Sequence, residues 1–371
     1  MSTTLLQERV RAQLAAGEPL RIAGTGAWLD AGRSVSAGTS LSLADDEGII
    51  DYVPGDLTLT ARAGTTLASI SRATGAEGQW LALDPFGAST GTLGATIATA
   101  SAGPLAHAFG TPRDAVLGLE VVTGTGAIVR AGGRVVKNVA GFDLTRLFTG
   151  AWGTLAVITE ITVRLRARPE RDETSALALP AGDALDAWLA RLRALPFAPL
   201  ALELVNAPLA TALGLGRNPL LVARLGGNED SVRAQRQLLG AFGDASSLPS
   251  HIWSALAEIE PGGAAVARVS APPSRLAALW ARLASRDEDA LVHATVGRGI
   301  VRTIRPTTAA HALAPWLARI ARCEGTHIFE RLPAEAWAAI PSRVDDPLSR
   351  AVRNAFDPAR ILNRGILGEV A

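Results

Sequence analysis

The sequence is poor in the residues that build covalent and metal-linked frameworks. It contains one cysteine, Cys323, so no disulfide can form within the chain. A zinc site made of thiolates and an iron–sulfur cluster held by cysteines within the chain are excluded for the same reason. The five histidines do not form a metal-ligand cluster in the sequence. We therefore predict no metal site and expect the cytoplasm as the compartment.

Long apolar runs and an excess of charge of one sign are also missing. No stretch is long and apolar enough to span a bilayer, although 48% of the residues are hydrophobic. The formal net charge of +1 provides no basic field for nucleic acid. The first predicted helix, with Leu6, Val10 and Leu14 on one face, carries charged residues that a secretory signal peptide would lack. We expect a soluble protein of more than one domain.

Lysine is almost absent as well. Of the 36 basic residues only Lys137 is a lysine, and every other one is an arginine. A codon bias toward arginine explains this pattern, and so does a lysine kept for a buried or ligand-facing charge. The second interpretation predicts that Lys137→Ala lowers ligand occupancy or assembly with partners.

The segment around this lysine, residues 134–165, is the most constrained stretch of the chain. Asp143 can cap a short helix, which Gly150 ends. Apolar and polar residues then alternate from Leu155 to Leu165, which predicts a strand with one face on a core. Gly150 and Gly153 lie before that strand and let backbone amides approach a ligand. We interpret this segment as a ligand edge lined by main chain.

Two glycine-rich segments precede it. A strand at 20–22 enters Gly24-Thr25-Gly26, a turn that can wrap backbone amides round a phosphate. The turn lacks the third glycine and the following helix of a dinucleotide-binding unit, so an NAD site is disfavoured and an ordinary tight turn stays open. Residues 91–104 are mostly too small to pack a core, and we interpret them as a loop along which a flat or phosphorylated ligand lies.

The hydrophobic pattern and the composition of the sequence change after Glu170. Amphipathic helices alternate with short strands, and the composition becomes rich in alanine and leucine. The predicted strands cover residues 201–205, 220–225, 264–269, 291–302 and 327–332. This pattern predicts an antiparallel sheet with helices on one face, an α+β arrangement.

Each histidine has an ordinary structural explanation that competes with a catalytic one. His107, His251 and His311 stand alone among small or apolar neighbours, and His327 opens a predicted strand. His293 differs because its strand meets a glycine break with Arg298 beside it. His293 and Arg298 are therefore the candidate catalytic base and cation, although packing remains the alternative.

Taken together, the motifs resemble the FAD-binding proteins of the vanillyl-alcohol oxidase and p-cresol methylhydroxylase superfamily. Across the whole chain they are similar to the FAD-binding subunits of bacterial glycolate oxidase, also called glycolate dehydrogenase. The resemblance rests on the segments IAGTGAW, YVPGDLTLTARAGTTL, GTLGATIATASAGP, FGTPRDAVLG, VVKNVAGFDLTRL, GTLAVITEI and FDPARILNRG. It implies an α+β fold with a two-part FAD-binding domain at 1–169, an α+β cap domain with an antiparallel sheet at 170–350, and a tail at 351–371 that returns to the first domain.

The resemblance also implies the residues that contact FAD. These are Gly24, Thr25, Gly26, Ala27, Trp28, Thr92, Leu93, Gly94, Ala95, Ile97, Ala98, Ser101, Gly103, Arg113, Asp114, Lys137, Asn138, Gly153, Thr154, Val157, Ile158 and Asn363. Ala27-Trp28 stands where relatives that tether the flavin often carry a histidine, so we expect non-covalent FAD. Ala95 and Ala156 replace glycines common in the family, which we expect to tune affinity. Arg364 replaces a usual proline, so the path of the tail is open.

The implied function is oxidation of glycolate, a small 2-hydroxy acid, to glyoxylate. The family resemblance implies a complex with a second FAD-binding flavoprotein subunit and an iron–sulfur subunit, peripheral at the inner face of the cytoplasmic membrane through that partner. The larger flavoprotein subunit is expected to carry a His-x-Gly-Asp-Gly-Asn-x-His metal motif, which does not occur in this sequence. The alternatives are a self-sufficient FAD-dependent alcohol or lactone oxidoreductase and a non-catalytic scaffold subunit.

Overall fold

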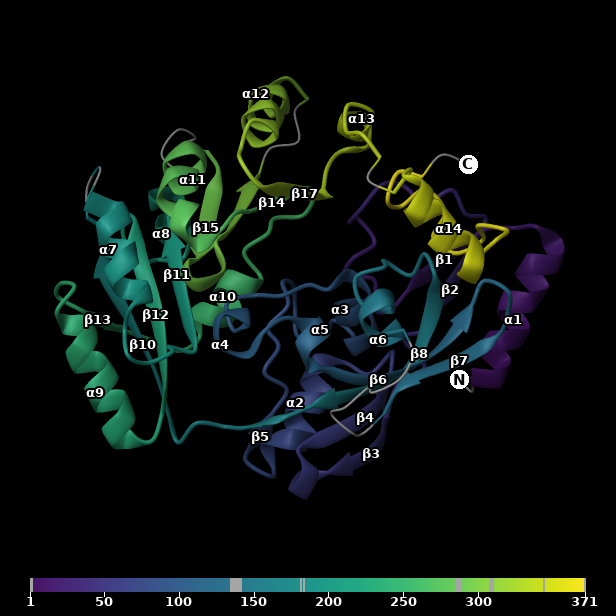
Figure 1. Cartoon of the computed structure of the whole chain (residues 1–371), viewed down its shortest axis with the longest axis horizontal. Helices are drawn as coiled ribbons and strands as arrows, with labels where there is room; N and C mark the ends of the chain where they lie inside the picture. Colours follow the sequence, from purple (N-terminus) through teal and green to yellow (C-terminus); the bar gives the residue numbers. More distant parts are fainter. Residues whose placement is uncertain are drawn as a thin grey trace. The chain divides into compact units, whose positions relative to one another are not determined.

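The computed structural model describes residues 3–133, 142–180, 182, 184–284, 289–306, 310–342 and 344–369 (Figure 1). The chain forms two compact units. Unit 1 comprises Met1–Ala102, Gly110–Arg168 and Ala338–Ala371, and unit 2 comprises Gly103–Phe109 and Pro169–Trp337. These bounds differ from the predicted domains at three places: 103–109 and Pro169 belong to unit 2, and 338–350 belongs to unit 1. Lys137 and Asn138 lie outside the described residues.

Unit 1 is built on a five-stranded antiparallel sheet in the order β3-β4-β8-β6-β7, with two small two-stranded sheets. Its strands are β1 (Leu20–Ala23), β2 (Thr39–Ser42), β3 (Ile49–Val53), β4 (Thr58–Arg62), β5 (Gln79–Trp80), β6 (Val116–Thr123), β7 (Ile128–Gly132), β8 (Ala156–Arg164) and β9 (Arg166–Ala167). Its helices are α1 (Thr3–Ala16), α2 (Leu67–Gly75), α3 (Leu93–Thr99), α5 (Pro112–Ala115), α6 (Leu144–Phe148) and α14 (Pro347–Phe356), with the short 3-10 helix η1 (Pro54–Asp56).

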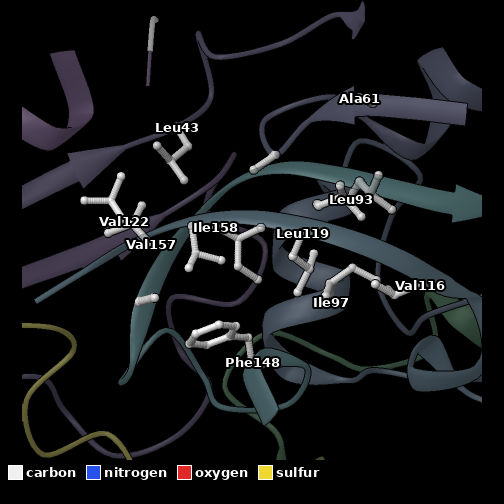
Figure 2. Close-up of a cluster of buried hydrophobic side chains, with 14 of the residues drawn as sticks. Leu43, Ala61, Leu93, Ile97, Val116, Leu119, Val122, Phe148, Val157 and Ile158 are labelled. Carbon is white, nitrogen blue, oxygen red and sulfur yellow. The ribbon is translucent and has the colours of Figure 1, made fainter. Parts of the chain in front are cut away.

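The core of unit 1 forms where α3 and α6 pack against β6 and β8. Figure 2 shows Leu93 and Ile97 of α3, Leu119 of β6 and Phe148 of α6 in one cluster of buried side chains. Leu93 and Ile97 are fully buried, so α3 is fixed in place by its apolar face. The helix predicted after Asp143 is confirmed, because the Asp143 carboxylate accepts a hydrogen bond from the backbone N–H of Arg146.

The C-terminal tail is hydrogen-bonded to the first strand of unit 1. The backbone N–H of Leu20 donates to the carbonyl of Ile361 at 2.6 Å, and the N–H of Asn363 donates to the carbonyl of Leu20 at 2.9 Å. Leu20 and Leu362 form a parallel bridge. Residues 361–363 therefore extend the sheet of β1 and β2 by a short strand-like segment.

Unit 2 is an eight-stranded antiparallel sheet with helices, as predicted for the α+β cap. The strand order is β13-β10-β12-β11-β15-β16-β14-β17. The strands are β10 (Arg171–Ala178), β11 (Ala201–Val205), β12 (Leu220–Gly227), β13 (Ser246–Leu248), β14 (Ala265–Ser270), β15 (Leu291–Thr295), β16 (Ile300–Arg305) and β17 (Thr326–Arg331). The helices are α4 (Ala106–Phe109), α7 (Ala184–Arg193), α8 (Ala207–Ala212), α9 (Glu229–Gly240), α10 (Ile252–Ala257), α11 (Leu276–Leu283), α12 (Ala310–Ala321) and α13 (Ala334–Trp337), with η2 (Pro273–Arg275) and η3 (Val296–Arg298).

Two expectations for this unit were wrong. The predicted strand at 291–302 is a hairpin of β15 and β16, because Gly299 adopts a left-handed backbone with φ 62° where a Cβ would lie 2.1 Å from the carbonyl oxygen of Ala271. Helices also contact both faces of the sheet. Trp316 of α12 bonds Thr303 on one face, and Trp253 of α10 bonds Thr174 on the other.

Candidate functional site

A pocket that is open to solvent lies in unit 1, between the loop after β1, helix α3 and the start of β8. Its lining consists of Arg21, Ile22, Ala23, Gly24, Thr25, Gly26, Ala27, Trp28, Leu29, Leu43, Ala63, Thr92, Gly94, Ala95, Ala98, Thr99, Trp152, Gly153, Ala156, Ile158, Asn363 and Ile366. Twelve of the residues expected to contact FAD are in this set.

The first wall of the pocket is the loop at 24–29, which is tied to the segment before α3. The Thr25 hydroxyl donates to the carbonyl of Thr90 at 3.0 Å. A Cβ at Gly24 would lie 2.5 Å from Oγ1 of Thr92, so only glycine allows this close approach. The two glycine-rich segments that the sequence analysis treated separately are therefore in contact.

The second wall is α3, which the sequence analysis interpreted as a loop. Thr92 caps this helix, since its Oγ1 accepts from the N–H of Ala95 at 3.2 Å. Gly94 presses against β4: its N–H donates to the carbonyl of Ala63 at 2.8 Å, and a Cβ there would lie 2.7 Å from that oxygen. Ala95, Ala98 and Thr99 line the pocket beside Gly94. These residues are too small to fill a core, and they form the face of α3 along the pocket.

Three residues predicted to contact FAD point elsewhere. Leu93, Ile97 and Val157 are fully buried in the hydrophobic core of unit 1 and do not line the pocket. In α3, Leu93 and Ile97 lie on the face that packs into the core. Gly94, Ala95 and Ala98 line the pocket. Successive side chains of a strand point to opposite faces, so in β8 Val157 packs in the core and Ile158 lines the pocket.

The third wall comes from the loop before β8. Trp152 and Gly153 both have left-handed backbones, with φ 55° and 66°. The N–H of Trp152 donates to the carbonyl of Ala98 at 2.8 Å, so this loop is attached to α3. The indole rings of Trp152 and Trp28 meet edge to face with centroids 6.1 Å apart. An apolar, aromatic surface therefore lies opposite the small face of α3.

Asn363 joins this loop to β1. Its Oδ1 accepts from the N–H of Ile22 at 2.8 Å, and its Nδ2 donates to the carbonyl of Trp152 at 2.8 Å. Asn363 is 5% exposed and has φ 43°, a conformation that asparagine tolerates better than most residues. Asn363, one of the residues expected to contact FAD, thus bridges two backbone segments of the pocket.

Arg21 lines the pocket and was missed by sequence reasoning. It is the one charged residue among the described residues of the lining. Its guanidinium donates to the carbonyl of Leu29 at 3.0 Å, and partial burial lowers the pKa of Arg21. A basic residue in a short strand that leads into a glycine turn was the available signal.

The remaining predicted residues of unit 1 stabilise loops near the pocket. The guanidinium of Arg113 donates to the carbonyl of Thr149 at 3.2 Å, and Asp114 forms a capping box with Thr111. The Thr154 hydroxyl donates to the carbonyl of Ala151, and Oγ of Ser101 accepts from the N–H of Phe86. Gly103 belongs to unit 2. These residues do not line the pocket.

The candidate catalytic pair has separate partners in unit 2. Nδ1 of His293 lies 2.8 Å from Oε2 of Glu203, and both side chains are buried. Arg298 lies in η3, and its Nη1 donates to the carbonyl of Ala106 at 3.4 Å. Burial and the charge of Arg298 lower the pKa of His107. His293 is therefore a partner of Glu203, which the sequence analysis did not identify.

The remaining histidines do not line the pocket of unit 1. His251 is exposed before α10, and the His327 ring meets Phe329 with centroids 5.7 Å apart. His311 lies in α12. Within the described part of the chain, no group of three or more His, Cys, Asp or Glu side chains is placed to hold a metal ion. The described helices include none that is both long and apolar enough to cross a membrane.

The pocket of unit 1 has the chemistry that a flavin dinucleotide requires. Glycines at 24, 26, 94 and 153 line the pocket with main chain, which a flat or phosphorylated group can approach. At 24, 94 and 153 a Cβ would collide with neighbouring protein atoms, so glycine lets the walls of the pocket pack together. Trp28 and Trp152 give aromatic contact, and Arg21 supplies one cation for a phosphate. The residues present therefore fit FAD.

Comparison with known proteins agrees with this chemistry. Residues 2–132 match the family model described as FAD binding domain. Glycolate oxidase subunit GlcE of Escherichia coli (strain K12) is 35% identical over 255 residues, which cover 68% of this chain and 67% of that protein. Glycolate oxidase subunit GlcD of Bacillus subtilis (strain 168) is 36% identical over 160 residues, 43% of this chain and 34% of that protein.

Solved structures with low sequence identity share the fold. A crystal structure of p-cresol methylhydroxylase aligns with a TM-score of 0.75 at 16% identity, covering 99% of this chain and 87% of that one. Alkyldihydroxyacetonephosphate synthase aligns with a TM-score of 0.70 at 18% identity, covering 96% and 74%. The cofactor is FAD, and the chain belongs to the FAD-dependent oxidoreductases, in the family of the glycolate oxidase subunits.

Proposed function

We propose that this chain is the FAD-binding subunit of a multi-subunit 2-hydroxy acid dehydrogenase that oxidises glycolate to glyoxylate. The observation that carries the proposal is the similarity to glycolate oxidase subunit GlcE, which extends over 68% of this chain, well beyond the residues that the FAD model matches. The match to glycolate oxidase subunit GlcD covers 34% of that protein. It therefore supports FAD binding, but neither the substrate nor the subunit composition.

The pocket residues have distinct roles in this proposal. FAD, when bound, supplies a two-electron acceptor for oxidation of the alcohol. The main chain at 24–28 and the Arg21 guanidinium hold its phosphates, and the small face of α3 accepts a flat portion of the cofactor. Trp28 and Trp152 keep water from that surface. Asn363 fixes the distance between β1 and the Trp152 loop.

The partners follow from what the chain itself cannot supply. Its one cysteine cannot ligate an iron–sulfur cluster, so we propose that an iron–sulfur subunit takes the electrons onward. Abstraction of hydride from a 2-hydroxy acid needs a base and a cation, and the metal motif expected for this task is missing from the sequence. A second flavoprotein subunit is therefore proposed, with the complex docked to the inner face of the cytoplasmic membrane through a partner.

The isolated chain is expected to oxidise glycolate at a small fraction of the rate of the assembled complex. The measurement is turnover of glycolate with an artificial electron acceptor, first with this chain alone and then after addition of the partners. Equal turnover in both would refute the multi-subunit proposal and assign a self-sufficient oxidoreductase. A complex that oxidises no 2-hydroxy acid would refute the substrate, and a chain purified without flavin absorbance would be a scaffold.

FAD is expected to leave the protein completely on denaturation. Ala27-Trp28 stands where a tethering histidine is often found, and the single cysteine, Cys323, belongs to unit 2, whereas the pocket is in unit 1. Acid precipitation should leave all flavin absorbance in the supernatant. Flavin that remains with the precipitated chain would contradict this prediction.

Arg21→Gln is expected to weaken FAD binding roughly 10- to 150-fold, since a charge-assisted hydrogen bond contributes roughly 1.5–3 kcal/mol. The dissociation constant can be measured from quenching of FAD fluorescence on reconstitution of the apoprotein. Arg72→Gln is the matched control, because Arg72 is an exposed arginine of α2 away from the pocket. Equal affinities for both variants would remove Arg21 from the site.

A further inference from the structure

Helices α11 and α12 contact each other in unit 2 (Figure 1), and a surface groove lies between them. The described residues that line the groove are Arg282 of α11, Pro315, Ala318 and Arg319 of α12, and Arg322, which directly follows α12. Positions 315, 318, 319 and 322 are three and four residues apart, so they share one side of the helix. The groove therefore has three cationic side chains and two short apolar ones, with no Asp or Glu among its described lining residues.

One hydrogen bond holds Arg282 against the end of α12. Its guanidinium donates through Nη1 to the carbonyl of Arg322 at 2.5 Å. Carbonyl groups at the end of a helix carry partial negative charge, which favours a cation beside them. A guanidinium has five N–H donors, and Arg282 makes no other hydrogen bond or ion pair in the described part of the chain. Most of its donors therefore remain for a ligand.

Arg322 is the second cation with unused donors. Its side chain is exposed, and its guanidinium makes no hydrogen bond or ion pair with the described residues. The neighbouring thiol of Cys323 responds to the charges of the groove, because burial raises its pKa while the positive charges of Arg282 and Arg319 act against that shift. Like charges gathered round one groove repel each other. An anion in the groove would relieve this repulsion.

The lining favours a phosphate group over a carboxylate. Arginine presents a planar fork of N–H donors that matches the oxygens of either group. A phosphate monoester has three terminal oxygens and a charge of about −1.5 to −2 at pH 7, so it can satisfy more than one guanidinium. A carboxylate has two oxygens and a single charge. The short side chains of Pro315 and Ala318 leave room between the arginines for the bulkier group.

We propose that the groove between α11 and α12 binds the phosphate group of an anionic ligand. Arg282 and Arg322 donate hydrogen bonds to it, and Arg319 supplies a third positive charge. The same chemistry occurs in soluble phosphate esters and in the headgroup of phosphatidic acid, a membrane lipid. The groove belongs to unit 2 and the FAD pocket to unit 1, so this site is distinct from the phosphate-binding loop of the cofactor.

Inorganic phosphate is the probe, titrated by calorimetry into the FAD-loaded chain at low ionic strength, where screening is weak. Bound FAD occupies the pocket of unit 1, so added phosphate reports on other sites. Arg322→Gln should weaken binding about tenfold or more, as expected for loss of a charge-assisted hydrogen bond. Arg322→Lys should recover part of the loss, because it keeps the charge without the fork. Arg217→Gln is the control, since Arg217 is exposed in unit 2 and does not line the groove.

Melting temperatures separate binding from a structural role. Without phosphate, Arg322→Gln should melt no lower than Arg217→Gln, because removal of an exposed cation from the groove relieves repulsion. Phosphate should raise the melting temperature of the unaltered chain and of the Arg217→Gln control, and leave that of Arg322→Gln unchanged. Failure of the unaltered chain to bind phosphate, or equal affinity in Arg322→Gln, overturns the inference.

Vesicle flotation distinguishes the two sources of the phosphate group. The FAD-loaded chain is mixed with phosphatidylcholine vesicles that contain phosphatidic acid, and with vesicles of phosphatidylcholine alone. Flotation with the first alone, lost in Arg322→Gln and kept in Arg217→Gln, identifies a lipid headgroup as the ligand. Phosphate binding without flotation identifies a soluble phosphate ester. Neither measurement involves turnover of glycolate, so the outcome is independent of the proposed function.

Discussion

Gly94→Ala is expected to destabilise unit 1 by about 1–3 kcal/mol, the usual cost of an extra methyl group in a well-packed site. It should also remove most of the bound FAD, because α3 forms one wall of the pocket. In an exposed helix the same change would stabilise by about 1 kcal/mol. Here the new Cβ would lie 2.7 Å from the carbonyl oxygen and 2.8 Å from the Cβ of Ala63, so repulsion exceeds the gain in propensity. Relief requires α3 to move away from β4, which breaks the bond from Gly94 N–H and shifts the pocket wall.

Urea unfolding and the flavin absorbance of the purified protein measure the two effects of Gly94→Ala. Gly75→Ala is the matched control in the same unit, since Gly75 is the last residue of α2 and a Cβ there meets only the end of Arg168 at 3.6 Å. The control should be neutral or slightly stabilising, with full FAD content. Gly94→Ala with unchanged stability and unchanged FAD would show that α3 is not held against β4 as described.

Asn363→Ala is expected to destabilise the protein by about 2–4 kcal/mol, because two partly buried backbone groups lose their partners. The N–H of Ile22 and the carbonyl of Trp152 both depend on this side chain. Alanine is also less suited than asparagine to a backbone at φ 43°. FAD content should fall with stability, since the bridge sets the width of the pocket.

Two further substitutions at the same position separate these contributions. Asn363→Gly removes both hydrogen bonds but tolerates the left-handed backbone, so it should be more stable than Asn363→Ala. Asn363→Asp keeps the acceptor for Ile22 but places a carboxylate against the carbonyl of Trp152. Thermal unfolding followed by flavin fluorescence gives the ranking. An Ala variant as stable as the unaltered protein would show that water replaces the bridge.

The regular elements of the fold were predictable where a local pattern and the tertiary contacts agree. Alternation over Leu155–Leu165 predicted β8, and Asp143 predicted the start of α6. Helix α3 was missed because it is short and only Leu93 and Ile97 mark its apolar face, while its other residues are small. The hairpin of β15 and β16 was missed because its apolar residues continue across Gly299.

The sequence predicts which segments form the pocket, but it does not predict which of their residues face the ligand. Motif resemblance identifies a stretch of chain and does not say which side chains point to the ligand, which explains why Leu93 and Ile97 were included with Gly94. Arg21 and Trp152 were missed because their positions depend on contacts between distant segments. Trp152, for example, is placed by its bond to Ala98.

The bridge made by Asn363 also fixes when the pocket can form during protein synthesis. Ile22 and Asn363 are 341 positions apart, and Trp152 and Asn363 are 211 apart. At about 5–20 residues per second, the ribosome needs roughly 10–40 s to pass from Trp152 to Asn363. The loop after β1, helix α3 and the Trp152 loop are thus all made long before the residue that joins two of them. If FAD retention needs this bridge, cofactor loading is a late step that follows synthesis of residue 363 and of unit 2, which precedes it in the chain.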